Sequence, residues 1–248
     1  MKKIFLLLTL IITLSTFNTS ASEQVQSDTL SIKAQSPLEA LKTMAANGDT
    51  EALNILGLCY EDGCNVERDK QRAYQYYRMS AERGDSHGMF KTARIMGEIE
   101  IPGMTKAQRQ SEAAKWTEKA AQNGYHRAVV DMIYGYSFGN PGFTKDDAKY
   151  FYWVKKAAEA GDQEYVEKLG ILYYNGFGCP VDYKKALEWL PKGVESGNSD
   201  CMLLLGNCYY LGNGVPEDKA KGIEWYRKAA KAGNQNVIDW LNQNGIRW

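Results

Sequence analysis

The chain has little histidine and no excess of charge of either sign. His87 and His126 are the only histidines among 248 residues. That scarcity excludes most histidine-based catalysis and any metal site built from several histidines. The 30 basic and 30 acidic side chains cancel to a formal net charge of zero. A neutral chain lacks the basic footprint of a nucleic-acid-binding protein, so we expect no nucleic-acid partner.

Two catalytic motifs and long apolar segments are also missing. The patterns H-E-x-x-H and S-x-x-K do not occur. G-x-S-x-G occurs once, at residues 135–139, inside a predicted helix instead of the strand-to-helix turn that the motif needs. The sequence therefore predicts no catalytic residue, no metal site and no cofactor. A bilayer-spanning helix needs about 20 apolar residues. No segment after the first 14 residues resembles one, so we expect no membrane span in the mature chain.

The N-terminus is typical of a secretory signal peptide. Met1-Lys2-Lys3 is basic, and an apolar run follows from Ile4 to Leu14, interrupted by two threonines. Small and polar residues come next, so residues 1–21 are predicted to be a signal peptide that is cleaved after Ala21. An uncleaved anchor is the alternative. Residues 22–36 are polar and aperiodic, which predicts a linker. We therefore expect an exported protein, either periplasmic or secreted.

Glycines recur at spacings of 36 to 40 residues through the rest of the chain: Gly48, Gly84, Gly124, Gly161, Gly197 and Gly233. An aromatic residue lies eight positions before each of the last five: Tyr76, Trp116, Trp153, Trp189 and Trp225. An acid lies fifteen positions before four of them: Asp69, Asp146, Asp182 and Asp218. Three markers that stay in phase over five units indicate a repeat architecture.

Each repeat predicts a pair of helices. The acid is placed to cap the N-terminus of the second helix, and the recurrent glycine to end it. The first helix carries a Leu-Gly pair, at Gly57, Gly170 and Gly206. A glycine inside a helix costs about 1 kcal/mol relative to alanine. Its recurrence at one phase therefore indicates that the paired helix approaches closely there. Ala93 and Ile133 replace this glycine in the second and third repeats.

The pattern LGxxYxxGxGVxxDxxKAxxWYxKAAxxG resembles the Sel1-like repeat, a relative of the tetratricopeptide repeat. The best copy ends at Gly233, and the resemblance covers residues 37 to 244. It implies an all-α, right-handed α/α solenoid over residues 37–248. The chain would then form a leading half-repeat, five helix-pair units at 49–84, 85–124, 125–161, 162–197 and 198–233, and a capping helix at 234–248.

The same resemblance implies an exported bacterial scaffold or adaptor that is not an enzyme. Stacked helix pairs leave a concave face on which a protein or peptide can bind, and we expect a monomer. A cell-wall-related or β-lactam-binding or -hydrolysing activity is the alternative, because it has been suggested for some exported relatives. The missing serine–lysine motif weighs against that alternative. An inhibitor or immunity-type role is a third interpretation.

Positions three, six, ten and thirteen after each recurrent glycine are predicted to line the concave face. Aromatic side chains beside arginines suit the recognition of a protein segment. The alternative is that the many tyrosines only pack the repeats. The candidate binding residues, with Phe138 added one position further on, are Phe90, Arg94, Arg127, Tyr134, Phe138, Tyr174 and Tyr210.

Five cysteines in an exported chain raise the question of disulfides. We hypothesise one bond between Cys59 and Cys64 and another between Cys179 and Cys208, with Cys201 a free buried thiol. Unpaired cysteines are the alternative. Relatives that bridge adjacent helices with cysteines would need a partner for Cys201, but Gly193 and Val194 occupy that region.

Overall fold

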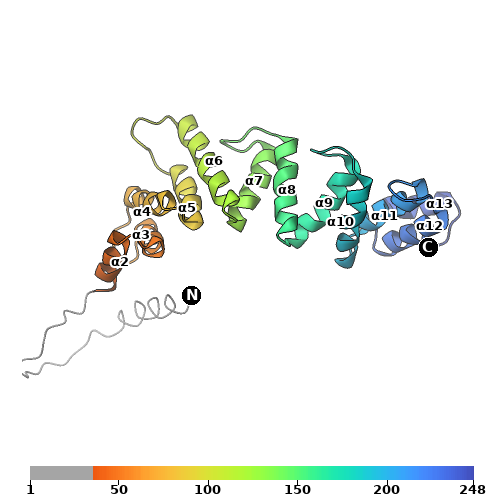
Figure 1. Ribbon diagram of the computed structural model, residues 1–248, viewed down its shortest axis with the longest axis horizontal. Helices are drawn as coiled ribbons and strands as arrows, with labels where there is room; N and C mark the ends of the chain where they lie inside the picture. The colour runs from red at the N-terminus through yellow and green to blue at the C-terminus, as the bar shows by residue number, and fades with distance from the viewer. Residues whose placement is uncertain (1–35) are drawn as a thin grey trace, which may run out of the picture. The chain divides into compact units, whose positions relative to one another are not determined.

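The computed structural model describes residues 36–248, so the predicted signal peptide and nearly all of the predicted linker lie outside the described residues. Within that range the chain forms helices and no strands, as predicted (Figure 1). The helices are α2 (Pro37–Ala46), α3 (Thr50–Asp62), α4 (Lys70–Glu82), α5 (Ser86–Met96), α6 (Lys106–Gln122), α7 (His126–Phe138), α8 (Asp147–Glu159), α9 (Gln163–Asn175), α10 (Tyr183–Glu195), α11 (Ser199–Leu211), α12 (Lys219–Lys231) and α13 (Gln235–Gln243).

The order of these helices confirms the predicted class, an all-α helical-repeat fold. Five pairs run from α3/α4 to α11/α12, α2 precedes them as a half-repeat, and α13 closes the series. The described residues divide into two compact units, residues 36–95 and 96–248, which we call unit 1 and unit 2. In unit 1, α3 packs against α2 and α4. In unit 2, each helix from α6 to α13 packs against the next.

The predicted N-caps are confirmed. The carboxylates of Asp69, Asp146 and Asp218 each accept a hydrogen bond from the backbone N–H three residues on, as does that of Asp182. The α6 helix has no such acid, and Thr105 begins it instead through a capping box with Gln108. The helix-ending glycines have positive φ angles, 89° at Gly84 for example, a conformation that costs glycine little.

The glycines inside the first helices lie against large side chains of the second helix. A Cβ added at Gly57 would lie 2.5 Å from the ring of Tyr77, and one at Gly206 would lie 2.5 Å from the ring of Tyr226. Close approach is therefore confirmed, although a ring rather than the backbone makes the nearest contact at these two positions. In the third repeat, Gly135 serves instead, where an added Cβ would lie 2.8 Å from the Phe143 ring.

The recurrent tryptophans lie partly at the surface. Trp153 is buried, but Trp116, Trp189 and Trp225 are only half-buried. A lysine three residues later lies over each of these three rings, at 4.5, 3.7 and 3.9 Å from the ring centroid to Nζ. The positive ammonium is attracted to the face of the indole ring at this distance.

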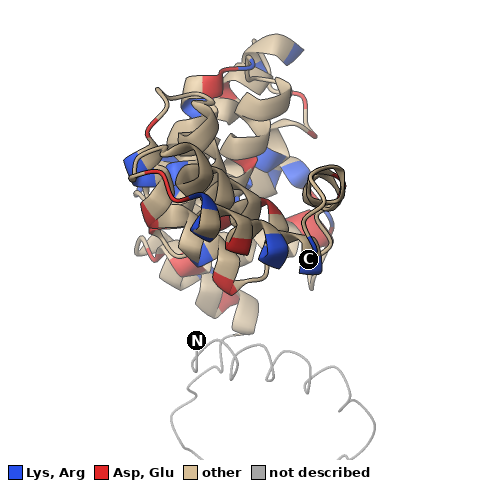
Figure 2. Ribbon diagram, turned by 90° about the vertical axis from the view of Figure 1, so that its right-hand side faces the viewer, with Lys and Arg blue, Asp and Glu red and all other residues tan. Residues whose placement is uncertain are grey.

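Charged residues of both signs alternate along the helices. Figure 2 shows basic and acidic residues close together on the same elements, and several form pairs one helical turn apart, such as Arg78 with Glu82 and Lys168 with Glu164. Each exposed pair of this kind contributes only a few tenths of a kcal/mol. No helix within residues 36–248 is both long enough and apolar enough to cross a bilayer.

Candidate functional site

The most exposed part of the predicted binding face lies on α7. Tyr134 is 44% exposed and Phe138 is 72% exposed, the highest value among the large hydrophobic side chains of residues 36–248. Their rings stack, with centroids 6.1 Å apart and planes 12° apart. Arg127 is exposed on the same helix, and spacings of seven and eleven residues put all three side chains on one stripe. The structure therefore brings these three predicted residues together.

Tyr174 and Tyr210 are only half-buried, and each also packs the repeats. The ring of Tyr174 meets that of Tyr183 edge-on at 5.2 Å, and its hydroxyl accepts a hydrogen bond from Asn213 at 3.5 Å. Burial raises the pKa of Tyr174. Tyr210 meets the ring of Trp240 edge-on at 5.5 Å. Both side chains thus combine a packing role with a partly open surface.

Phe90 must be removed from the predicted binding residues, because its side chain is only 3% exposed. The prediction that it faces a partner is wrong. Its helix, α5, also buries Met89 and Ala93 on either side of it, so the buried face is broad enough to include the sixth position after the glycine. Arg94, one turn later, stays exposed, with its guanidinium 5.9 Å from the centroid of the Phe90 ring.

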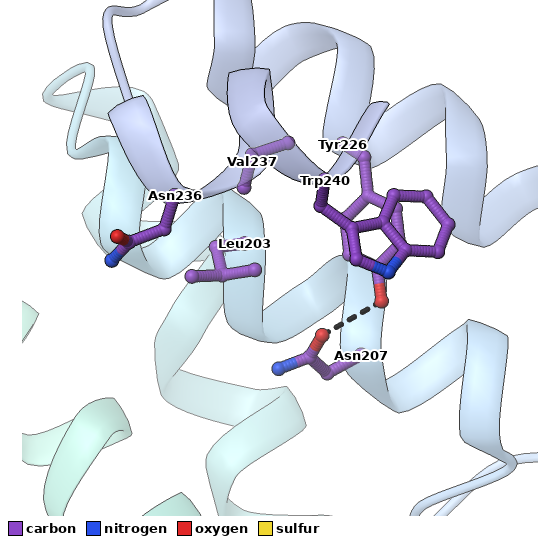
Figure 3. Close-up of a pocket in the computed structure, with 6 residues that line it drawn as sticks. All are labelled: Leu203, Asn207, Tyr226, Asn236, Val237 and Trp240. Carbon is purple, nitrogen blue, oxygen red and sulfur yellow. Dashed lines mark hydrogen bonds between the residues drawn. The ribbon is translucent and has the colours of Figure 1, made fainter. Parts of the chain in front are cut away.

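A small pocket lies at the C-terminal end of unit 2 (Figure 3). Its volume is about 170 Å³, and α11, α12 and α13 each contribute to its wall. Leu203 and Asn207 come from the predicted face positions of α11. The remaining lining residues are Tyr226, Asn236, Val237 and Trp240. We did not predict the residues from α13, because the sequence indicated only a cap for that helix.

Aromatic rings and amides give this pocket its chemistry. The rings of Tyr226 and Trp240 meet at 5.0 Å and 65°. The Tyr226 hydroxyl donates to Oδ1 of Asn207 at 2.7 Å (Figure 3), and burial raises its pKa to about 12, so it stays a neutral donor. An apolar wall beside the amides of Asn207 and Asn236 suits an apolar side chain whose backbone hydrogen-bonds at the rim.

All five cysteines are free thiols in the structure, so neither hypothesised disulfide is formed in it. Cys59 and Cys64 lie close together at the end of α3, where the backbone N–H of Cys64 donates to the Cys59 carbonyl. Cys208 is fully buried in α11, which raises its pKa to about 11. Cys179 instead has its thiol 3.7 Å from the Leu172 carbonyl.

Cys201 is a buried free thiol, as predicted, and burial raises its pKa to about 12. A Cβ added at Gly193 would lie 2.5 Å from its sulfur, so the residue that the sequence indicated as the missing partner does lie beside it. Among residues 36–248, no three histidine, cysteine or acidic side chains gather in a way that could hold a metal ion.

Comparison with known proteins identifies the repeat. The family model for the Sel1 repeat matches five segments, residues 50–85, 88–125, 132–162, 167–198 and 199–234. A protective antigen present in uropathogenic Escherichia coli strains, which displays an SLR fold, is 30% identical with a TM-score of 0.57. That match covers 83% of this chain but only 43% of the antigen. A Sel1 repeat protein from Oxalobacter formigenes is 29% identical with a TM-score of 0.54, over 84% of this chain and 83% of the other.

Proposed function

The chain belongs to the Sel1 repeat family, and from this premise we propose that it is an exported, non-enzymatic adaptor that binds a protein or peptide. Sel1 repeat proteins generally serve as protein-interaction scaffolds. The proposed contact surface is the exposed face of α7 with the neighbouring face of α9 and α11. Residues 1–21 would direct export to the periplasm or the medium.

One observation carries this proposal, the exposed stack of Tyr134 and Phe138 on the same helical stripe as Arg127. Large exposed aromatic side chains lose apolar surface to water when a partner covers them, and fully burying one contributes about 1.5–3 kcal/mol. Aromatic and arginine side chains are also those that most often dominate binding energy at protein interfaces. Tyr174 and Tyr210 would extend the contact along unit 2.

The test is affinity capture from cell-envelope extracts with the full chain as bait. Replacing Tyr134 and Phe138 together by alanine is expected to weaken the capture of a specific partner by about 2–4 kcal/mol, roughly 30- to 1,000-fold in Kd. Tyr152→Ala is the matched control, because Tyr152 is 47% exposed but lies on a second helix, α8. Equal partner capture by the double variant, at unchanged helicity, would reject the proposed surface.

A further inference from the structure

Unit 1 contains an open cleft that the proposed contact surface does not use. Its volume is about 570 Å³. Glu51, Asn54 and Leu58 line it from α3, Tyr77 from α4, and Asp85 and Lys91 from α5 and the residue before it. The cleft thus combines an apolar wall with several charged groups within three helices.

Two carboxylates of this cleft, those of Glu51 and Asp85, have no cationic partner among the described residues. The only lysine, Lys91, has its Nζ 3.0 Å from Oε2 of Glu61, which also accepts a hydrogen bond from the Tyr77 hydroxyl at 2.5 Å. Oδ1 of Asp85 already accepts hydrogen bonds from the Gly88 N–H, the Ser80 hydroxyl and Nδ2 of Asn54. His87 also borders the cleft, and burial lowers its pKa, so it adds no positive charge at neutral pH.

A buried amide in the cleft wall has an unsatisfied acceptor. Asn54 is 8% exposed, and its Nδ2 donates to Oδ1 of Asp85 at 2.7 Å. Because a carboxylate can only accept, this contact fixes which way the amide points. Its Oδ1 then has no hydrogen-bond partner among the described residues. A buried acceptor without a partner costs free energy and calls for an explanation.

We propose that this cleft binds an arginine side chain of the protein or peptide partner. The aliphatic stem would lie against Leu58, which is 43% exposed, and the half-buried side chain of Ile55. The guanidinium has five N–H donors in a planar fork, and Glu51, Asp85 and Asn54 present acceptors to it. Because Oδ1 of Asn54 is buried, a lining side chain must shift slightly to admit the donor. That the arginine belongs to a protein partner rests on the proposed function. Binding of an arginine side chain in the cleft does not depend on the contact surface of α7.

The test is an NMR titration of the ¹⁵N-labelled protein with N-acetyl-arginine amide. We expect saturable shifts of the backbone amides in residues 51–58 and 85–91. N-acetyl-citrulline amide has nearly the same shape without the charge, and it should bind at least about tenfold more weakly. N-acetyl-lysine amide should bind more weakly than the arginine compound, because an ammonium lacks the planar fork that pairs with a carboxylate through two hydrogen bonds. Equal binding of the arginine and citrulline compounds would overturn the proposal.

Matched variants separate the site from general electrostatics. Glu51→Gln should weaken binding of the arginine compound about five- to tenfold. Glu67→Gln removes the same charge from an exposed loop outside the cleft and should leave binding unchanged. Equal losses in both variants would contradict the proposal. The titration uses no protein partner, so a negative result would not bear on the capture experiment with Tyr134 and Phe138. A failure of the capture experiment would likewise leave the titration result standing.

Discussion

Replacing the glycine inside a first helix by alanine stabilises or destabilises the protein according to the side chain packed against it. Gly57→Ala should gain about 1 kcal/mol from helix propensity. However, the new Cβ would lie 2.5, 2.6 and 2.9 Å from three carbons of the Tyr77 ring, and Tyr77 is fully buried. Overpacking of this kind costs about 1–3 kcal/mol. We expect a net destabilisation of up to about 2 kcal/mol.

The control is the same substitution made in a Tyr77→Leu variant, which lacks the aromatic ring beside residue 57. In a Tyr77→Leu protein the space beside residue 57 is open, so only the propensity gain remains. Gly57→Ala should then stabilise the protein by up to about 1 kcal/mol, although Tyr77→Leu is itself destabilising. The assay is thermal unfolding followed by circular dichroism, in which 1 kcal/mol corresponds to about 2–4 °C for a chain of this size. A stabilising effect of Gly57→Ala in the wild-type background would refute the close-approach reasoning.

Three further predictions concern the thiols and the helix caps. Gly193→Cys should form a disulfide with Cys201 on mild oxidation, seen as a loss of two thiols by mass spectrometry after alkylation; unchanged thiol counts would contradict the contact. Exposed Cys64 should react with a thiol reagent at pH 8 well before Cys201, whose pKa burial raises to about 12; equal rates in the folded protein would disagree. The backbone N–H of Lys185 lowers the pKa of Asp182. The stabilisation from this charge is therefore present above the unfolded pKa of about 4 and lost as the pH falls through the folded value. In urea unfolding, the advantage of wild type over Asp182→Asn should shrink at low pH, and a constant difference would be inconsistent.

Much of the fold could be predicted because its signals are local. An aspartate that caps a helix and a glycine that ends one act within a few residues of chain, so their period in the sequence marks the helix boundaries directly. The N-caps at Asp69, Asp146 and Asp218 lie where the period placed them. Cys201 was also placed correctly, because it occupies the position that the small buried residues Ala52 and Ala128 occupy in other repeats.

The features that could not be predicted depend on contacts between helices, and the spacing of residues along the sequence does not specify these contacts. Phe90 follows the face pattern by position, but α5 is buried over a broader arc than the other first helices. Gly135 replaces the missing helix glycine two residues late, because the residue it must accommodate is Phe143 from the following loop. Trp240 completes the C-terminal pocket from a helix that the sequence marked only as a cap. The close approach of Asn54 to Asp85 joins residues 31 positions apart.

Hydrogen–deuterium exchange of the captured complex would show which helices the partner covers. We expect the backbone amides of α7, His126–Phe138, to exchange more slowly when the partner is bound, with weaker protection in α9 and α11. Protection confined to the second helices α8, α10 and α12, with α7 unchanged, would contradict the proposal that the protein binds its partner through the exposed face of its first helices.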